Sequence, residues 1–376
     1  MTEPDNKVYT VIGVMCGTSM DAIDVALVRT DGKDFTKLVN FKSFDNDDHY
    51  KEAVRAVFTR TKEDDEVRFA EKVVTDAHIE AIKNSGFEAD LIGCHGQSIT
   101  HNPEGRFTWQ LGDFQRIADK TGMDVIADLR QADIAEGGQG APLLPLCHRA
   151  FASEAERPIA ILNLGGVGNI TYLGVERGDI LAFDTGPANA LIDDVVKAKT
   201  GRNYDSEGEL ALAGKVHLNM VDDWLKHPFF EKSYPKSLDR DEWEVRRAYD
   251  LPLEDAVATL ATFTVQSVHK ALKLLPDTPA TIYVAGGGRK NKFIMRELDK
   301  IMPCKVEPVE ALDWNGDAVE AKGFAYLAVR SELGLPLTLP TTTGVSEPMT
   351  GGKLYKSSFA SDTNSSSGAL RAATTK

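Results

Sequence analysis

VYTVIGVMCGTSMDAIDVALV, residues 8–28, decides the fold, and PIAILNLGGVGNITYL, residues 158–173, repeats its plan. In each stretch, an apolar run long enough for a β-strand leads into a turn of small and polar residues, and a second apolar run follows. Residues 16–21 form the first turn and residues 165–169 the second. Each stretch therefore predicts a β-hairpin with a polar tip, and the repetition predicts two related halves.

Beyond the hairpins, apolar runs alternate with segments of helical periodicity, which is typical of an α/β fold. We expect helices at 66–83, 113–121, 190–199, 253–275, 292–302 and 317–333, and further strands at 90–94, 123–127, 180–183 and 281–285. Residues 136–142 contain too many glycines for a regular element.

Length and composition are those of a globular protein of two domains. The 376 residues predict domains at about 1–155 and 156–355, and a Ser/Thr-rich tail, 356–376, that we expect to be disordered. A net charge of −14 argues against nucleic-acid and membrane partners. The four cysteines form no Cys-x-x-Cys pair, and no run of 18 apolar residues occurs, so we expect a cytoplasmic protein.

Four turns with small or polar residues follow predicted strands, at 17–21, 165–169, 184–189 and 286–291. Open α/β sheets bind ligands beyond their strand ends, so we expect these turns to converge on one cleft. An ordinary Ser/Thr/Asp turn remains the alternative for the first of them, and close packing of a helix on a strand for the triple glycine. The sequence lacks the P-loop, the Rossmann Gly-x-Gly-x-x-Gly and the His-Glu-x-x-His motif, which excludes those enzyme classes.

Eight ordered motifs resemble those of the anhydro-N-acetylmuramic acid kinase family, within the sugar kinase/Hsp70/actin type of ATPase. They lie at 13–24, 95–98, 110–113, 137–143, 163–171, 183–187, 286–291 and 317–321. Three positions depart from the family pattern: Cys16 replaces a usual Ser, and Ala22 and Ala188 replace usual Gly residues. Because Ala disfavours positive φ, we expect ordinary backbone angles or strain at these two positions.

The resemblance implies an α/β fold of two actin-like (ribonuclease H-like) domains with a central cleft for ATP and sugar. Such kinases hydrolyse the 1,6-anhydro bond of anhydro-N-acetylmuramic acid and phosphorylate O6, giving N-acetylmuramic acid 6-phosphate in peptidoglycan recycling. By resemblance, Asp184 is the base that activates water. A helix N-cap is the alternative role for this residue, because a predicted helix follows it.

The resemblance also assigns the binding residues, a Mg²⁺ held by Asp21 through water, and a homodimer. ATP-binding residues are Gly17, Thr18, Ser19, Met20, Asp21, Ala22, Ile23, Asp24, Gly165, Gly166, Asn169, Gly286, Gly287, Gly288 and Asn291, and sugar-binding residues are His95, Gln97, Asp113, Arg130 and Glu320. Arg130 would pair with the lactyl carboxylate of the sugar, and a surface ion pair with Asp128 or Asp133 is its alternative. A solvated helix face is the alternative for Glu320.

Two other functions remain open from the sequence. A levoglucosan-type kinase would keep the fold and the mechanism while acting on a 1,6-anhydro sugar without lactyl and acetamido groups. A non-enzymatic actin-like protein would use ATP as a switch and would polymerise with nucleotide.

Overall fold

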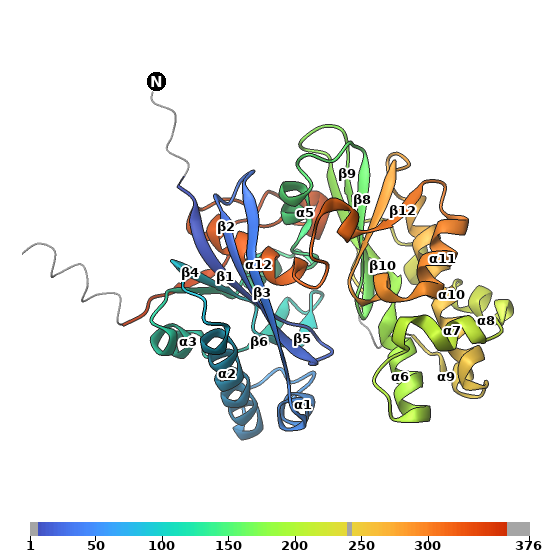
Figure 1. Cartoon of the computed structure of the whole chain (residues 1–376), viewed down its shortest axis with the longest axis horizontal. Coiled ribbons are helices and arrows are strands. Elements are labelled where there is room, and N and C mark those ends of the chain that lie inside the picture. The colour runs from blue at the N-terminus through green and yellow to red at the C-terminus, as the bar shows by residue number, and fades with distance from the viewer. Residues whose placement is uncertain (1–6, 239–242, 359–376) are drawn as a thin grey trace, which may run out of the picture. The chain divides into compact units, whose positions relative to one another are not determined.

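The computed structural model describes residues 7–238 and 243–358, which divide into two compact units (Figure 1). Unit 1 comprises residues 7–140, 320–338 and 345–358, and unit 2 comprises the described residues from 141 to 319 together with 339–344. A domain boundary near residue 155 stays a prediction. Most of the predicted tail lies outside the described residues.

Unit 1 is built on a six-stranded sheet that begins with the predicted hairpin. The sheet order is β13-β7-β4-β1-β2-β3, with β1 antiparallel to β2, β2 antiparallel to β3, and β4 and β7 parallel to β1. Its strands are β1 (Tyr9–Cys16), β2 (Ala22–Thr30), β3 (Thr36–Asp45), β4 (Leu91–Cys94), β7 (Val125–Ala127) and β13 (Lys353–Tyr355). A separate hairpin pairs β5 (Gln97–Asn102) with β6 (Phe107–Leu111).

The helices of unit 1 have clear sequence signals at their ends. For α2, the side chain of Asp64 accepts from the amide of Val67 at the start, and Gly86 ends the helix with a φ of 67°. The helices are α1 (Asp48–Arg55), α2 (Asp65–Ser85), α3 (Phe114–Thr121), α4 (Gln131–Ala135) and α12 (Val319–Glu332).

Helix α12 lies directly on the sheet of unit 1 because two strand positions are glycines. A Cβ on Gly13 would lie 1.8 Å from the carbonyl oxygen of Ala321, and a Cβ on Gly93 would lie 2.2 Å from that of Phe324. No side chain fits at either position. The last predicted helix therefore packs across β1 and β4, next to the first polar turn.

Unit 2 repeats the same order of strands in a five-stranded sheet, β10-β9-β8-β11-β12. Three antiparallel strands, β8 to β10, are followed by β11 and β12, which run parallel to β8. The strands are β8 (Ile159–Leu164), β9 (Val167–Leu173), β10 (Ile180–Pro187), β11 (Thr281–Ala285) and β12 (Lys305–Pro308). The repeated order confirms the predicted α/β fold of two ribonuclease H-like domains.

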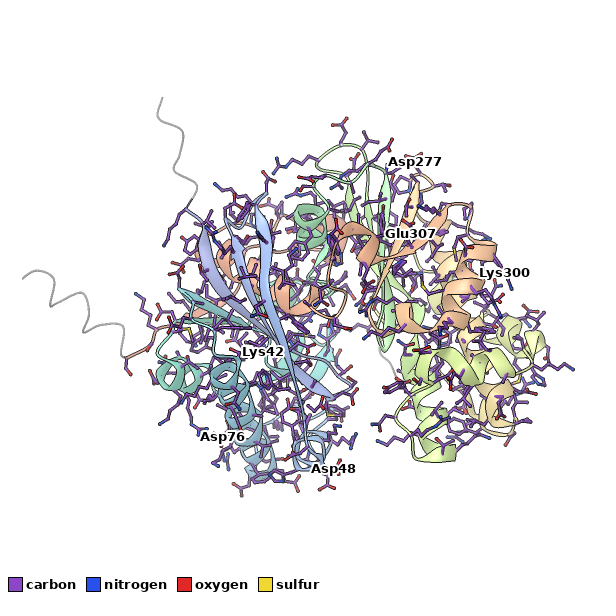
Figure 2. The ribbon with its side chains drawn as sticks, viewed as in Figure 1. Lys42, Asp48, Asp76, Asp277, Lys300 and Glu307 are labelled. Atoms are coloured by element: carbon purple, nitrogen blue, oxygen red, sulfur yellow. The ribbon has the colours of Figure 1, made fainter. Side chains whose placement is uncertain are left out.

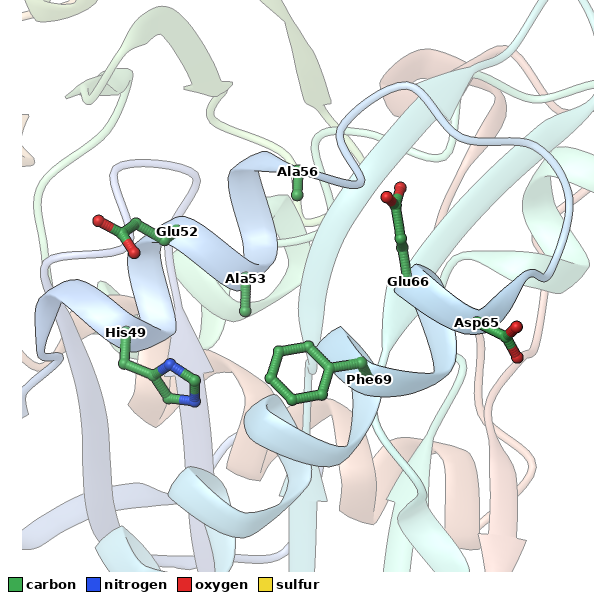
Figure 3. A pocket seen from close by; sticks show the side chains of 7 residues that line it. All are labelled: His49, Glu52, Ala53, Ala56, Asp65, Glu66 and Phe69. Carbon is green, nitrogen blue, oxygen red and sulfur yellow. The ribbon is translucent and has the colours of Figure 1, made fainter.

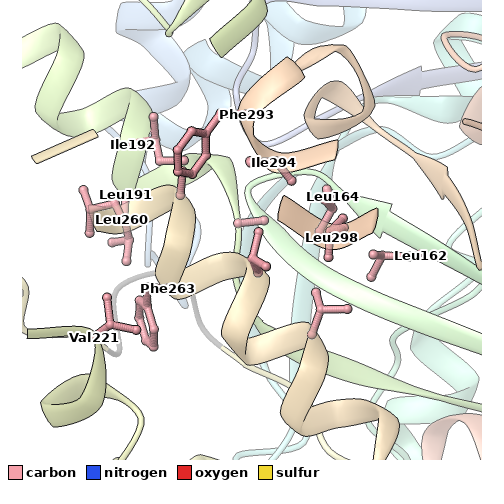
Figure 4. Packing of buried hydrophobic residues seen from close by; sticks show 14 of the residues in the cluster. Leu162, Leu164, Leu191, Ile192, Val221, Leu260, Phe263, Phe293, Ile294 and Leu298 are labelled. Carbon is pink, nitrogen blue, oxygen red and sulfur yellow. The ribbon is translucent and has the colours of Figure 1, made fainter. Parts of the chain in front are cut away.

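The core of unit 2 forms where helices cover this sheet. Phe263 and Leu260 on α10 pack with Leu191 on α6 and with Leu162 and Leu164 on β8 (Figure 4). The α-helices are α5 (Pro145–Phe151), α6 (Asn189–Thr200), α7 (Glu209–Ala213), α8 (Leu218–Trp224), α9 (Arg246–Tyr249), α10 (Leu253–Leu272), α11 (Lys292–Ile301) and α13 (Pro340–Thr343). The 3₁₀ turns are η1 (Ser206–Gly208), η2 (Pro228–Glu231), η3 (Gly287–Lys290) and η4 (Val309–Leu312).

The surface of both units is charged, in keeping with the composition. Lys42 and Asp48 in unit 1 and Asp277 and Lys300 in unit 2 are exposed (Figure 2). No helix within residues 7–238 and 243–358 is long and apolar enough to cross a membrane.

Several elements differ from the predicted ones in their bounds, and some were not predicted at all. Strand β10 continues to Pro187, four residues beyond the predicted end, so Asp184 lies within the strand rather than after it. The β5–β6 hairpin was not predicted, and neither were β3 and α1. The first tail residues are ordered by hydrogen bonds, since the amide of Ser357 donates to Asp124 at 2.8 Å and that of Ser358 to Asp119 at 3.0 Å.

Candidate functional site

The first predicted phosphate turn, residues 17–24, joins β1 to β2 in unit 1. Thr18 and Ser19 are exposed at its tip, and the amide of Met20 closes the turn by donating to the carbonyl of Gly17 at 3.0 Å. Met20 adopts a φ of 60°, with its side chain 4 % exposed in the core. The exposed hydroxyls and main chain at the tip can meet an anion, whereas the side chains of Met20 and Ile23 cannot.

Neither Ala departure places the backbone at a positive φ. Ala22 begins β2 within the antiparallel pairing, and Ala188 has a φ of −125°. Neither residue is among the described non-glycine residues with positive φ. Ala22 thus has the ordinary backbone of a strand, whereas Ala188, with a ψ of −116°, lies in neither the helical nor the extended region.

A buried network supports this turn from below. The Tyr50 hydroxyl donates to Oε1 of Gln97 at 3.0 Å and also lies 3.5 Å from the sulfur of Cys16. The amide nitrogen of Gln97 lies 3.4 Å from the carbonyl oxygen of Gly17, and Asn46 donates to the carbonyl of Met20 at 3.1 Å. Gln97 is fully buried, so in this structure its side chain supports the turn instead of facing a ligand.

Cys16 is an unreactive thiol in this buried network. Burial raises the pKa of its thiol to about 11, against the weaker opposing effect of hydrogen bonds from Tyr50 and Asn46. Cys16 is therefore a small buried residue that accepts hydrogen bonds, much as the Ser usual in the family would.

His95 and Arg130, both predicted on the sugar side, lie together in unit 1. The guanidinium Nε of Arg130 lies 3.1 Å from Nε2 of His95, and its Nη1 donates to the carbonyl of Gly140 at 2.6 Å. Burial, and then the Arg130 charge, hold the pKa of His95 well below its usual value. The neutral imidazole therefore accepts from Arg130 at Nε2, while Nδ1 donates to the carbonyl of Gly96 at 3.0 Å.

Asp133 and Asp128, the two carboxylates named as alternative partners of Arg130, accept hydrogen bonds in the structure. The Asp133 carboxylate accepts from the amide of Gly140 at 2.6 Å and from the hydroxyl of Thr338, and it holds the Gly-rich loop in place. The Asp128 carboxylate accepts from the hydroxyl of Tyr355. Arg130 itself is oriented by its bonds to His95 and to the carbonyl of Gly140.

Asp113 and Glu320, both predicted to bind the sugar, lie in different structural environments. Asp113 is the N-cap of α3, where its carboxylate accepts from the amide of Arg116 at 2.9 Å. Glu320 lies in the first turn of α12 and is half-buried, one residue before the close contact of Ala321 with Gly13. A capping role for Asp113 accounts for its position, while Glu320 stays a predicted sugar contact.

Asp21, the predicted magnesium partner, is exposed. Its side chain is 61 % exposed beside the first turn, and the ammonium of Lys51 lies 3.8 Å from it. In the described part of the chain, no group of three His, Cys, Asp or Glu residues is arranged to hold a metal. Mg²⁺ bound with nucleotide commonly uses one or two carboxylates together with phosphates and water, and one exposed carboxylate suits that mode.

In unit 2, the second hairpin turn is tied to the start of α6. The amides of Ala188 and Asn189 donate to the carbonyls of Gly166 and Gly165, at 3.0 and 2.9 Å. The Asn189 side chain also donates to the carbonyl of Leu164 at 2.8 Å. The turn at 165–169 and the segment that contains Asp184 are thereby held as one assembly.

The triple glycine joins the same assembly. A Cβ on Gly286, which has a φ of 73°, would lie 2.6 Å from the carbonyl oxygen of Leu164, and one on Gly288 would lie 2.5 Å from the Cβ of Leu164. Gly287 is exposed and has more room. Asn291 caps α11 by accepting from the amide of Ile294 at 3.1 Å. Close packing of the backbone and an exposed glycine thus occur together in one turn.

Asp184 lies in a bulge of β10, opposite Asn169 of β9. Its Oδ2 accepts from the amide of Leu238 at 2.8 Å, and its own amide donates to the carbonyl of Lys236 at 3.0 Å. The residue is 8 % exposed. The N-cap of α6 is Ala188, so the alternative role of Asp184 as a helix cap is excluded. A fixed, nearly buried carboxylate is suited to accept a proton from a positioned water.

Sequence patterns did not point to Asn46, Tyr50 or Lys236. Asn46 and Tyr50 lie at the end of β3 and in α1, beyond the motifs, and Lys236 lies in an irregular segment. The lysine is 6 % exposed, which is rare for this residue type, and no spacing in the sequence signals such burial.

A pocket of about 350 Å³ lies between α1 and α2 (Figure 3). His49, Ala53 and Phe69 line it, and the rings of His49 and Phe69 meet edge to face at 5.7 Å. It contains none of the predicted site residues.

Comparison with known proteins agrees with the motifs. The profile of the anhydro-N-acetylmuramic acid kinase family matches residues 9–357. Anhydro-N-acetylmuramic acid kinase of Zymomonas mobilis is 45% identical over 360 residues, covering 92% of this chain and 99% of that protein. The kinases of Rhizorhabdus wittichii and Rhodospirillum rubrum are each 43% identical, covering 92% and 94% of this chain and 98% and 96% of those proteins. The chain belongs to the anhydro-N-acetylmuramic acid kinase family, which confirms the prediction of an ATP-dependent carbohydrate kinase.

Proposed function

We propose that this kinase opens the 1,6-anhydro ring of anhydro-N-acetylmuramic acid with water and phosphorylates O6, with Asp184 as the general base. The main observation is the fixed carboxylate of Asp184, bonded to the Leu238 amide beside the glycine turns of unit 2. The names of the relatives supply the substrate.

The reaction balances with one base. Asp184 takes a proton from water, the water oxygen bonds to C1 of the sugar, and the bond from C1 to O6 breaks. The electron pair stays on O6, which bonds to the γ-phosphorus of ATP while the bond to the ADP oxygen breaks. Positioned general-base catalysis typically contributes a factor of about 10² to 10⁴, so much of the turnover should depend on this carboxylate.

For the nucleotide, the exposed turn at Thr18 and Ser19 and the glycines of unit 2 are the proposed phosphate and adenosine contacts. Their small residues and main-chain amides suit an anion that must approach the backbone closely. Asp21 is the proposed partner of Mg²⁺, through water, and the ion would neutralise phosphate charge when bound.

On the sugar side, Arg130 is the proposed partner of the lactyl carboxylate. Its orientation by His95 and by the carbonyl of Gly140 supports that role, because a fixed guanidinium can bind a carboxylate with two parallel bonds. Levoglucosan has no carboxylate for Arg130 to bind. We also propose a cytoplasmic homodimer, as the family resemblance implies.

The decisive experiment compares wild type with Asp184→Asn, and with Asp194→Asn as a control for loss of an exposed carboxylate on α6. Product formed from Mg-ATP and anhydro-N-acetylmuramic acid in ¹⁸O-labelled water is analysed by mass spectrometry. We expect ¹⁸O at C1 and a loss of at least about a hundredfold in kcat for Asp184→Asn alone, with both substrates still bound.

Three results would change the proposal. Normal turnover by folded Asp184→Asn would remove the assigned base. Product from levoglucosan alone would move the substrate while keeping the mechanism. Sugar-independent ATP hydrolysis together with nucleotide-dependent polymers would favour the switch function.

A further inference from the structure

Lys236 is a buried lysine that the reaction described above does not use. Its side chain lies in the core of unit 2, beside the strand that holds Asp184, and the residue is only 6 % exposed. Lysines are almost never buried to this degree without compensating partners. The surroundings of its ammonium therefore indicate what it does.

Two aromatic rings and a carbonyl surround the ammonium. Its Nζ lies 4.3 Å from the ring centroid of Phe229 and 5.7 Å from that of Phe183, and it donates to the carbonyl of Phe229 at 3.3 Å. Phe183 directly precedes Asp184 in β10. Cation–π attraction is strongest where water is excluded, so this cage holds the side chain of Lys236 in one place.

The main chain of the same segment holds Asp184 at two points. The carbonyl of Lys236 accepts from the amide of Asp184 at 3.0 Å, and the amide of Leu238 donates to Oδ2 of Asp184 at 2.8 Å. A segment of three residues thus fixes both the backbone and the carboxylate of the proposed base. The side chain in the aromatic cage is what fastens that segment to η2 and β10.

We propose that Lys236 is a positioning residue for Asp184: it fastens the segment that orients the carboxylate and supplies a nearby positive charge that keeps the carboxylate ionised. This inference rests on the proposed role of Asp184 as the base. It adds a second residue to the reaction, without direct contact between Lys236 and the substrate.

The charge of Lys236 depends on its burial and on the charged groups around it. Four charged groups act on Lys236: Asp184 and Glu231 stabilise its charge, and Lys232 and Lys270 oppose it. Burial has the largest effect and lowers the pKa of Lys236 to about 8. The ammonium is therefore charged at pH 7 and lowers the proton affinity of Asp184, but it loses this charge as the pH rises through about 8.

The test measures kcat and KM against pH for Lys236→Met, which keeps the length without the charge, and for Lys236→Arg, which keeps a charge that does not titrate. Lys270→Met is the matched control, because this lysine also lies over an aromatic ring, Phe230, at 5.2 Å, but donates to the carbonyl of Leu225.

For Lys236→Met, we expect kcat at pH 7 to fall at least about tenfold, with both KM values within about twofold of wild type. In the plot of kcat against pH, the acid limb should move to higher pH, because Asp184 loses a neighbouring positive charge. In Lys236→Arg, the acid limb should return toward the wild-type position, and an alkaline limb near pH 8 that is present in wild type should disappear. Lys270→Met should leave the acid limb in place and move the alkaline limb to higher pH, because it removes a positive charge that opposes the charge of Lys236.

An unchanged kcat in folded Lys236→Met would overturn the proposal. A lower kcat with an acid limb at the wild-type pH would also overturn it, because that result indicates a purely structural role for Lys236. If Lys236→Met fails to fold, the alkaline limb decides: its persistence in folded Lys236→Arg contradicts the proposal. Turnover by Asp184→Asn would instead refute the proposed role of Asp184 as the base. If Asp184→Asn is inactive while the Lys236 variants have wild-type kcat, only the inference about Lys236 is refuted.

Discussion

Arg130 donates from Nε to Nε2 of His95 at 3.1 Å, and this bond defines the proton arrangement of a fully buried imidazole. His95 keeps its proton on Nδ1, which faces the carbonyl of Gly96. The histidine therefore orients the guanidinium as a neutral acceptor. His95 and Arg130 form one hydrogen-bonded pair, in which only the arginine is charged.

Replacement of His95 should weaken sugar binding while leaving nucleotide binding intact. In His95→Phe the ring contact with Phe324, at 4.7 Å between centroids, remains possible, but the acceptor for Arg130 is lost. A hydrogen bond to a charged group contributes about 1.5–3 kcal/mol, so we expect the Kd for anhydro-N-acetylmuramic acid to rise about 10- to 100-fold by calorimetry. The exposed His49→Gln serves as control. A proportional loss of ATP affinity would contradict a role confined to the sugar side.

The stability of the protein should fall steeply below about pH 6.5. Burial lowers the pKa of His78 to about 4 and that of His148 to about 3, and it holds the pKa of His95 well below the usual value. Between these values and 6.5, the unfolded chain binds protons that the folded chain does not, so the free energy of unfolding decreases as the pH falls. Each histidine contributes a slope of up to about 1.4 kcal/mol per pH unit.

Urea unfolding at pH 8, 6 and 5 measures that slope, and His78→Leu tests it at one residue. Nε2 of His78 has no hydrogen-bond partner within the described residues, and Nδ1 donates to the carbonyl of Val74 at 2.8 Å, so the substitution removes one titrating group at the cost of one hydrogen bond. The slope for His78→Leu should be smaller by about one proton. An unchanged slope would show that His78 takes up its proton in the folded state.

Residue patterns predicted the fold well because both hairpins are local. Residues 8–28 and 158–173 place apolar runs and turns next to each other in the sequence, and the hairpins β1–β2 and β8–β9 are observed there. The β5–β6 hairpin was not predicted because polar residues occupy both faces of β5. Thr100 and His101 are adjacent, so polar and apolar residues do not alternate with the period of two that marks a strand.

Motifs located the turns of the site, but they did not separate ligand-facing side chains from supporting ones. Gln97 and Asp113 lie within motifs, yet the first is fully buried under the Gly17 turn and the second caps α3. Lys236 supports Asp184 from 52 positions further along the chain, through main-chain bonds and aromatic rings. Such contacts depend on the folded path of irregular segments, which periodicity does not encode.

Alkylation should distinguish the four cysteines, none of which forms a disulfide. Burial raises the pKa of the Cys16 thiol to about 11 and that of Cys94 to about 12, while Cys147 is fully buried. Cys304 is half-buried. Because only an accessible thiolate reacts, iodoacetamide at pH 8 followed by peptide mass spectrometry should modify Cys304 first and leave the other three intact in the folded protein. Early modification of Cys16 would contradict the buried network around Tyr50.

Substitution of Gly93 should destabilise unit 1 more than its small size suggests. A Cβ at this position would lie 2.2 Å from the carbonyl oxygen of Phe324 and 2.8 Å from the Cβ of Ala328, so Gly93→Ala must push α12 away from β4. Overpacking of this kind typically costs about 1–3 kcal/mol, and we expect a loss of that size in urea unfolding. Gly178→Ala, with no atom within 4 Å of the added Cβ, is the matched control. Because α12 also holds Glu320, sugar affinity should fall together with stability in Gly93→Ala, and a destabilised variant with normal sugar affinity would separate Glu320 from the sugar site.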